Sequence, residues 1–281
     1  MALTIVLLVI ACAVAALQTW RWADERAADR LWRRLEHSPP GACPKFHSSM
    51  VDGLPDPARR YFLFTIAPGT RLSRVAEIEM TGSINLGGKR KPNTLAMKAR
   101  QIIAAPHGLV WKLEARRGLM RVSGSDGAGD GASWTRFWLF GLLPVVRAGG
   151  NTDHLKSAFG RVVAESVFFA PAALLPGENV RWKPVDEQTA RAVVEHAGME
   201  QEVEITVNEK GQPVKVTIER WSDANPEKAF RHQPFGGFVD TFRAFDGYTL
   251  PTRIEGGNHI GTDEYFPFYQ ASVTRLQFLH L

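Results

Sequence analysis

The side chains of this 281-residue chain that could act as acids or bases are carboxylates and histidines, and one carboxylate stands out. Glu165 lies in an apolar stretch, among Val162, Val163, Val167 and Phe168. Burial in such surroundings raises the pKa of a carboxyl group and is common at functional sites. The alternative is a structural ion pair with an arginine. The candidate partners for that pair are Arg136, Arg147 and Arg161.

Metal chemistry has little support in the pattern. The eight histidines are scattered, no two have the i, i+4 spacing of a helical metal site, and no Cys-x-x-Cys accompanies them. The glycine-rich segment 126–132 lacks the ligands of an EF-hand, because Ala128 takes the third position and Phe137 the twelfth. We therefore predict no metal and no cofactor, and we interpret residues 126–132 as a hairpin turn.

Familiar catalytic motifs are also missing. The chain has no G-x-S-x-G elbow, and its glycine-rich stretch has no Gly-Lys-Ser/Thr ending of the kind that binds nucleotide phosphates. We name no catalytic residue and favour a non-enzymatic protein. An enzyme acting on lipid-like substrates through Glu165 is the less favoured alternative.

Charge does not indicate nucleic-acid binding. The formal net charge is +5, and the densest basic run is Lys89 to Lys91, between glycines and a proline. A nucleic-acid surface would need exposed aromatic residues among these charges, or a recognisable motif. We interpret the run as a solvated hairpin tip, with a phosphate or head-group contact as the alternative.

The N-terminus predicts a membrane anchor over residues 1–20. Residues 2–17 carry no charge, about the shortest length that spans a bilayer, and Trp20 and Trp22 suit the head-group zone. A cleaved signal peptide would need a basic start, and a lipoprotein cleaved before Cys12 would need polar residues after it. These two alternatives are less favoured. The cell membrane is therefore the expected location, with a single span.

Residues 21–53 are expected to connect this anchor to the globular part. Residues 20–37 place apolar side chains three or four positions apart, opposite an arginine-rich face, which predicts an amphipathic helix on the membrane surface or a helical stalk. Residues 38–44 contain three prolines and end the helix. The arginines after the span would hold the globular domain in the cytoplasm by the positive-inside rule. That rule alone leaves the side of the membrane open.

Residues 54–281 predict a single α+β domain. A short helix over 54–69 is followed by strands, then by a long helix within 151–177, and then by strands again. The eleven or twelve expected strands have short connections, which is typical of an antiparallel sheet with one face covered. The run at 133–150 has too few apolar residues to span a bilayer and predicts a core strand buried on both faces.

The chain resembles an uncharacterised family of bacterial membrane-anchored proteins. The resemblance rests on "LPDPARRYF" (54–62), "FWLFGLLPVV" (137–146), "PAALLPGENVRWKPVDEQTARAVV" (171–194) and "FGGFVDTFRAFDGYTLPTRIEGG" (235–257). Members look like the half-barrel of lipoprotein carriers, in which a curved antiparallel sheet wraps a helix over an apolar cavity. The resemblance implies binding of lipid or lipoprotein acyl chains and no known activity.

Applied to this chain, the half-barrel suggests an apolar site between sheet and helix. Its concave face would carry Trp111, Trp138, Phe140 and Val146, and the helix would contribute Phe159, Val163, Glu165 and Phe169. Acyl chains would gain about 0.8 kcal/mol per buried methylene there. The alternative is a protein-interaction scaffold in which these side chains simply fill the core. Aromatic segments at 231–238 and 265–269 indicate a bulge and a turn, and the second of these could form the rim of an opening.

Overall fold

The computed structural model describes residues 1–37 and 44–279, and its centre is a single 13-stranded antiparallel sheet. The first strands are β1 (Val75–Asn85), β2 (Thr94–Ala104), β3 (Gly108–Arg117), β4 (Met120–Gly129), β5 (Ala132–Leu139) and β6 (Leu143–Gly149). The remaining strands are β7 (Val180–Pro184), β8 (Thr189–His196), β9 (Met199–Val207), β10 (Pro213–Ser222), β11 (Arg231–Phe245), β12 (Tyr248–Asn258) and β13 (Phe266–Phe278). The open, curved sheet confirms the predicted α+β half-barrel.

The helices are few. They are α1 (Ala2–Glu36), α2 (Asp56–Thr65) and α3 (Thr152–Phe169), with short 3-10 turns η1 (Ser48–Val51) and η2 (Pro171–Leu174). Asn151 caps α3 by accepting a hydrogen bond from the backbone N–H of His154 at 2.8 Å. The predicted helices at 54–69 and within 151–177 are therefore present, with Pro171 just beyond the end of α3.

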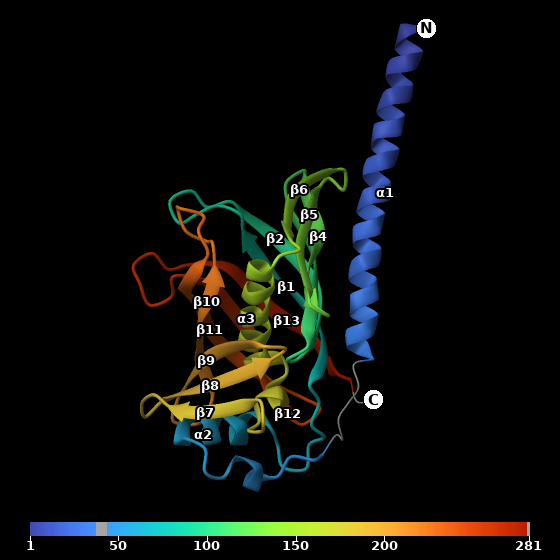
Figure 1. Ribbon diagram of the computed structural model, residues 1–281. Coiled ribbons are helices and arrows are strands. Elements are labelled where there is room, and N and C mark those ends of the chain that lie inside the picture. The colour runs from blue at the N-terminus through green and yellow to red at the C-terminus, as the bar shows by residue number, and fades with distance from the viewer. Residues whose placement is uncertain (38–43, 280–281) are drawn as a thin grey trace.

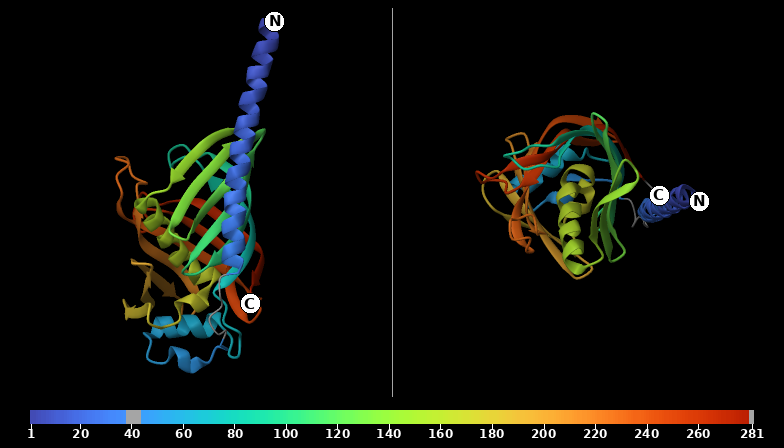
Figure 2. Two further views of the ribbon diagram at one scale, coloured as in Figure 1. Left: turned by 45° about the vertical axis from the view of Figure 1, so that its right-hand side comes forward. Right: turned by 90° about the horizontal axis from the view of Figure 1, so that it is seen from above.

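Strand order explains why α3 lies inside the sheet. Strands adjacent in sequence pair with each other, except that β6 and β7 do not; β1 also pairs with β13, so β6 and β7 form the two edges. The chain between these edges is α3, which must cross the sheet to connect them. Seen from above, α3 runs within the curve of the sheet (Figure 2). At one end Tyr61 of α2 donates a hydrogen bond to the carbonyl of Val167 in α3 at 2.6 Å, which joins the two helices.

The hairpin turns follow ordinary turn chemistry. The predicted turn within 126–132 is the two-residue loop Asp130–Gly131 between β4 and β5, and both residues have positive φ, 52° and 73°. Such a pair is typical of the tight turn that matches the twist of a hairpin. The basic run Lys89 to Lys91 lies in the connection between β1 and β2, as expected of a hairpin tip.

The single core strand predicted over 133–150 is wrong. The segment forms the hairpin β5–β6, with a turn at Phe140 and Gly141, whose φ angles are 53° and 67°. Strand β6 is an edge strand and is largely exposed, including Val145 and Val146. The apolar run therefore reflects two strands joined by a turn, only the first of which packs into the core.

The N-terminal helix α1 is continuous from Ala2 to Glu36 and packs on the outer face of β2, β3 and β4 (Figure 1). The helical stalk is thus what forms, without a break near residue 20. Its buried face contains Asp24, Ala28, Leu31, Trp32 and Leu35, so Leu31 and Leu35 of the predicted apolar face are buried, whereas Trp20, Ala23 and Ala27 are not. The predicted linker at 38–44 lies outside the described residues except for Pro44.

The first half of α1 extends beyond the sheet (Figure 1). Its apolar window has a mean hydropathy of 2.4, and none of this window is buried against the rest of the chain. By length and composition this stretch is sufficient to cross a bilayer, a criterion that N-terminal signal sequences also meet.

A buried carboxylate holds α1 to the sheet. Asp24, whose side chain is 9% exposed, receives hydrogen bonds from Arg136, Arg147 and the indole Nε1 of Trp138, the last at 3.1 Å. Its two oxygens therefore join α1 to both strands of the β5–β6 hairpin. Removal of this carboxylate would leave the two arginines without their charged partner, which costs much free energy.

We expect Asp24→Asn to lower the free energy of unfolding by about 3 kcal/mol, because two arginines and an indole lose their charged acceptor. Urea unfolding of the full chain in a non-ionic detergent measures this. Asp29→Asn is the matched control, since its partner Lys112 and the carboxylate are half exposed, and it should cost under about 1 kcal/mol. Equal losses in the two variants would contradict the assignment.

Two histidines bring the turns of distant strands together. His107, between β2 and β3, meets His196 at the end of β8 with ring centroids 4.9 Å apart. Burial lowers the pKa of both rings; for His107 the charges of His196 and Arg74 add to this and Asp130 opposes it. Each ring therefore favours its neutral form more in the folded protein than in the unfolded chain.

This contact predicts a loss of stability in mild acid. A folded-state pKa below the unfolded value of 6.5 means that the unfolded chain binds more protons, so stability is complete above about pH 6.5 and falls as the pH drops below it. Urea midpoints between pH 7.5 and 5.5 should decline, and His196→Asn should decline less steeply. A substitution of the exposed His47 by Gln should leave the wild-type slope. Identical slopes in all three proteins would refute this origin.

Candidate functional site

A cavity of about 240 Å³ lies between α3 and the concave face of the sheet. Its walls come from α3 and from strands at both halves of the sheet, β1, β3, β4 and β5 on one side and β10 to β13 on the other. Because α3 crosses the sheet between its edges, one helix face can line a space that many strands share. The cavity is thus a direct result of the strand order.

Aromatic side chains make most of the apolar wall. Seven of them line the cavity: Trp111, Phe137, Phe168, Phe169, Phe235, Phe268 and Tyr269. Trp111 is at the centre of this group, with ring centroids 6.3 Å from Phe137 and 6.1 Å from Tyr269. Burial, with a smaller effect of Glu165, raises the pKa of the Tyr269 hydroxyl, which stays neutral and donates a hydrogen bond to the sulfur of Met80.

The absence of a side chain at Gly256 contributes part of the volume of the cavity. A Cβ built on Gly256 of β12 would meet no heavy atom closer than the carbonyl oxygen of Gly236, at 3.9 Å. By contrast, Cβ atoms on Gly236 and Gly237 would collide with neighbouring backbone carbonyls at 2.1 and 1.8 Å. The glycines of β11 therefore serve close strand packing, whereas Gly256 leaves room beside the cavity.

One side of the cavity is ionic. Arg161 of α3 donates hydrogen bonds to Glu165 at 2.5 Å and to Asp126 of β4 at 2.6 Å, and Gln101 of β2 donates to the other oxygen of Glu165. Burial alone would lower the pKa of Arg161, but the two carboxylates overcome this and hold it above its usual value. The predicted structural alternative for Glu165, an ion pair with an arginine, is the one observed.

A second buried arginine lies nearby. Arg220 of β10 donates to the hydroxyl of Ser157 at 3.1 Å and lies over the ring of Phe235. Burial, together with the charge of Arg161, lowers the pKa of Arg220 to about 10. It therefore remains a cation at neutral pH. The cavity combines an aromatic wall with two buried cations, of which Arg161 is compensated by direct carboxylate contacts.

Three of the seven predicted site residues line this cavity: Trp111, Glu165 and Phe169. Phe159 and Val163 are buried in the hydrophobic core on α3 and are not among the residues that line it. The placement of Trp138 and Phe140 on the concave face is wrong. Trp138 contacts Asp24 and Trp20 of α1 on the outer face, and Phe140 is 58% exposed at a turn.

Strand alternation explains the error. Successive residues of a strand point to opposite faces, so a shift of one position exchanges the two faces. In β5 the cavity side chain is Phe137, and Trp138 beside it points to α1. Reasoning from the sequence also missed Asp126, Arg161 and Arg220 as a group, because their contacts join β4, α3 and β10.

The family of the chain follows from its sequence. Residues 44–271 match a family of unknown function, DUF6544. The chain belongs to this family. The match covers strands β1 to β12 and the first part of β13, and it leaves α1 outside. No curated protein matches the chain.

Three solved bacterial structures are similar to this DUF6544 protein. A LolA superfamily protein from Nitrosomonas europaea is 10% identical with a TM-score of 0.38, covering 80% of this chain and 93% of its own. A putative outer membrane lipoprotein-sorting protein domain from Vibrio parahaemolyticus is 14% identical with a TM-score of 0.34, covering 73% and 85%. A DUF1329 family protein from Desulfovibrio piger is 10% identical with a TM-score of 0.38, covering 73% and 86%. At these values the likeness transfers no function.

The ionic side of the cavity predicts the effect of a conservative change. We expect Glu165→Gln to lower the free energy of unfolding by on the order of 2 kcal/mol, because buried Arg161 would keep only Asp126 as a charged partner. Chemical denaturation at pH 7 measures it. Glu195→Gln, in an exposed pair with Arg181, serves as the control and should cost under about 1 kcal/mol. Unchanged stability in Glu165→Gln would instead favour a catalytic role for this carboxyl group.

Proposed function

We propose that this DUF6544 protein is a membrane-tethered, non-enzymatic domain that binds one acyl chain of a lipid or lipoprotein in the cavity between α3 and the sheet. The observation that carries the proposal is the aromatic cavity itself. Close packing usually leaves few voids larger than a water molecule in a protein core. A cavity of about 240 Å³ with seven aromatic side chains in its wall is larger than such voids.

The size of the cavity limits the ligand. Small-molecule sites usually begin at about 300 Å³, slightly above the roughly 240 Å³ found here. The space therefore suits a single acyl chain rather than a whole lipid molecule. Each buried methylene would contribute about 0.8 kcal/mol to binding. This argues for an apolar chain with its polar end held elsewhere.

One polar atom of a lining residue, buried behind the surface of the cavity, supports an ester-linked chain if the indole turns toward the ligand. The indole Nε1 of Trp111 is buried and has no hydrogen-bond partner among the residues that the structure describes. An unsatisfied buried donor costs about 1–3 kcal/mol. A ligand carrying an ester or amide carbonyl could accept this hydrogen bond, which a plain hydrocarbon could not.

The carboxylate of Glu165 favours binding over catalysis. Its two oxygens accept hydrogen bonds from Arg161 and Gln101, so both are occupied within the protein. A general base needs an oxygen within reach of the substrate's proton. In the proposed function Glu165 orients Arg161, and the arginine keeps the polar side of the cavity closed to hydrocarbon.

The tether is the N-terminal half of α1. In this proposal residues 1–20 form the anchor, residues 21–53 connect it, and residues 54–281 form the binding domain. The apolar, fully exposed stretch of α1 supports the anchor, and Asp24 supports a fixed position of the domain beside it. The domain would therefore take its ligand at the membrane surface instead of carrying it away.

A localised cross-linking experiment tests the binding site. The full chain is placed in lipid nanodiscs with a monoacylglycerol that carries a photoreactive diazirine on its acyl chain, and the labelled peptides are mapped by mass spectrometry. We expect label in the segments around Phe168, Phe235 and Gly256. Gly256→Leu should reduce it about tenfold, because its side chain displaces two or three methylenes.

Two further variants sharpen the result. Gly177→Leu places the same side chain in open, exposed space and should label like the wild type. Trp111→Phe should weaken labelling by the ester probe more than labelling by a photoreactive alkane, because the smaller ring affects both probes and the loss of the indole N–H affects only the ester. Label spread evenly over the protein, or unchanged in Gly256→Leu, would mean that the cavity does not bind acyl chains.

A further inference from the structure

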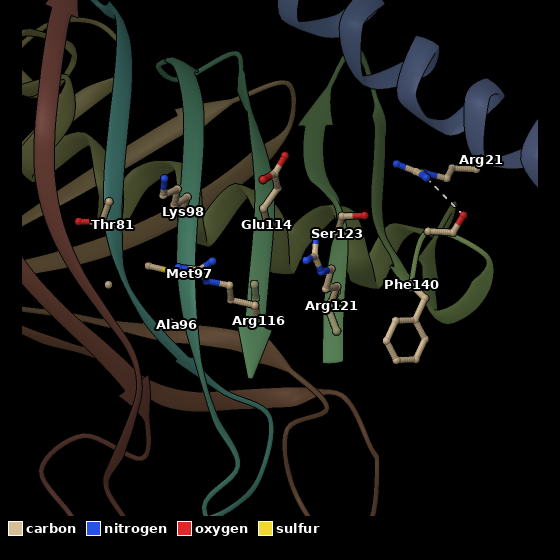
Figure 3. Close-up of a pocket in the computed structure, with 14 residues that line it drawn as sticks. Arg21, Thr81, Ala96, Met97, Lys98, Glu114, Arg116, Arg121, Ser123 and Phe140 are labelled. Carbon is tan, nitrogen blue, oxygen red and sulfur yellow. Dashed lines mark hydrogen bonds between the residues drawn. The ribbon is translucent and has the colours of Figure 1, made fainter. Parts of the chain in front are cut away.

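A groove of about 660 Å³ lies on the outer face of the sheet, next to the middle of α1. It is separate from the cavity between α3 and the sheet (the acyl cavity), since α3 lies on the opposite face. The side chains that line it come from Arg21 of α1, from β1 to β4, and from the β5–β6 turn (Figure 3). Four of the lining residues are cationic, Arg21, Lys98, Arg116 and Arg121, and the only carboxylate among them is Glu114. The groove is strongly positive.

The strand register places two of these cations directly opposite each other. Arg116 of β3 pairs with Arg121 of β4 in the register, so both guanidinium groups lie on the outer face (Figure 3). Like charges in directly opposite positions destabilise a sheet. Among the described residues neither arginine has an ion-pair partner, and the same holds for Lys98. The register places Glu114 opposite Lys98 and no carboxylate opposite Arg116 or Arg121, so the two arginines lack a balancing anion.

The adjoining part of the outer face is balanced. One row further along the strands, Lys112 forms an ion pair with Asp29 of α1, and Arg136 forms one with Asp24. The helix therefore supplies carboxylates to the cations beneath its second half. Arg21, the α1 residue beside the groove, is itself a cation and is paired with Glu25 at 2.9 Å. Arg100, opposite Lys112 in the same row, lies over the ring of Trp32, so α1 provides partners for the cations of this row and none for Arg116 and Arg121.

The position of the groove along α1 indicates the source of the anion. Gln18 of α1 donates to the carbonyl of Gly141 at 2.9 Å and Arg21 to the same oxygen at 3.3 Å, which fixes the groove beside the point where the apolar run of the helix ends. Trp20 and Trp22 are exposed at the same height, as in the aromatic belt of membrane proteins. The groove therefore lies at head-group level if α1 crosses the bilayer.

We propose that this groove binds the phosphate-bearing head group of an anionic lipid in the membrane that α1 enters. Arg116 and Arg121 bind the phosphate through charge-assisted hydrogen bonds, and Lys98 contributes a further charge. Phe140, exposed at the rim of the groove, contacts the start of the acyl chains. The inference rests on the tethering part of the proposed function and not on the acyl cavity.

The test is the thermal stability of the full chain in neutral detergent micelles, with lipid added in increasing amounts. Phosphatidylglycerol should raise the melting temperature, because a ligand that binds the folded state stabilises it. The double variant R116Q/R121Q should need about tenfold more of this lipid for the same shift, since it loses charge-assisted hydrogen bonds. Without lipid its melting temperature should equal or exceed that of the wild type, because the repulsion is removed.

Controls separate the groove from other sites. R59Q/K210Q removes two exposed cations near α2, outside the groove, and should respond like the wild type. Gly256→Leu should keep a response to phosphatidylglycerol that depends on Arg116 and Arg121, because it alters only the acyl cavity. If R116Q/R121Q does not fold, R121Q alone serves in its place. A loss of the lipid response in R59Q/K210Q equal to that in R116Q/R121Q would overturn the site.

The added compound identifies the source of the anion. In Gly256→Leu, whose acyl cavity is blocked, diacylglycerol, which has no phosphate, should leave the melting temperature unchanged, and phosphatidylcholine should act more weakly than phosphatidylglycerol. An equal shift with diacylglycerol or phosphatidylcholine would overturn an anionic head-group site. An equal shift with inorganic phosphate would make the groove a site for free anions and not for lipid.

Carbonate extraction of membranes tests the tether independently. Retention of the full chain together with no response to phosphatidylglycerol would refute the head-group site and leave the proposed function standing. Release of the chain by carbonate would refute the tether and this inference with it. Retention and a response that depends on Arg116 and Arg121 would support both.

Discussion

The fold depends on one topological constraint, the connection of the two edge strands of a 13-stranded sheet by a single helix. Strands β6 and β7 are at opposite edges, and α3 is the main element of the chain between them. A helix that joins two distant edges of one sheet must cross a face of it, and the sheet must curve for its edges to meet the ends of that helix. The curvature, the covered face and the cavity beneath α3 all follow from this connection.

That constraint also explains why buried charges surround α3. A helix enclosed by a sheet cannot direct all of its polar side chains to water. Arg161 is one such residue, and Asp126, Glu165 and Gln101 supply the acceptors and donors that a buried ion requires. The same group limits the acyl cavity, because a hydrocarbon chain gains nothing from contact with paired ions. Thus the solution to a folding problem also defines the polar end of the proposed binding site.

Much of the fold could be predicted from the sequence, because its signals are local. Alternating strands, glycine turns and the capped helix from Thr152 are all encoded over short distances. The face of each side chain was harder to predict where both faces are covered. In β5 the neighbours Phe137 and Trp138 are both apolar, one lining the acyl cavity and the other contacting α1. Periodicity cannot distinguish two apolar faces, so Trp138 was assigned to the wrong one.

The same limit applies to residues whose partners are distant in sequence. Asp24 lies in an arginine-rich helix, and its sequence surroundings predict a solvated charge. Its partners Arg136 and Arg147 come from a hairpin more than a hundred positions away. The candidate ion pair of Glu165 was easier to predict, because Arg161 is four residues before it on one helix face. Gly256 gave no sequence signal of a cavity, since the space beside it is evident only when α3 and the sheet are assembled.

In the proposed function, the rigid attachment of α1 does more than hold the domain at a membrane. A flexible anchor would leave the domain free to rotate, and no surface of the sheet would have a fixed distance from the lipid. Here Asp24 and the contacts at Gly141 fix α1 against the sheet at two heights. The apolar end of α1 and the cations of β3 and β4 therefore keep fixed positions relative to each other. Because of that rigidity, uncompensated arginines at this height would face head groups whenever the helix is in the bilayer, whatever the acyl cavity holds.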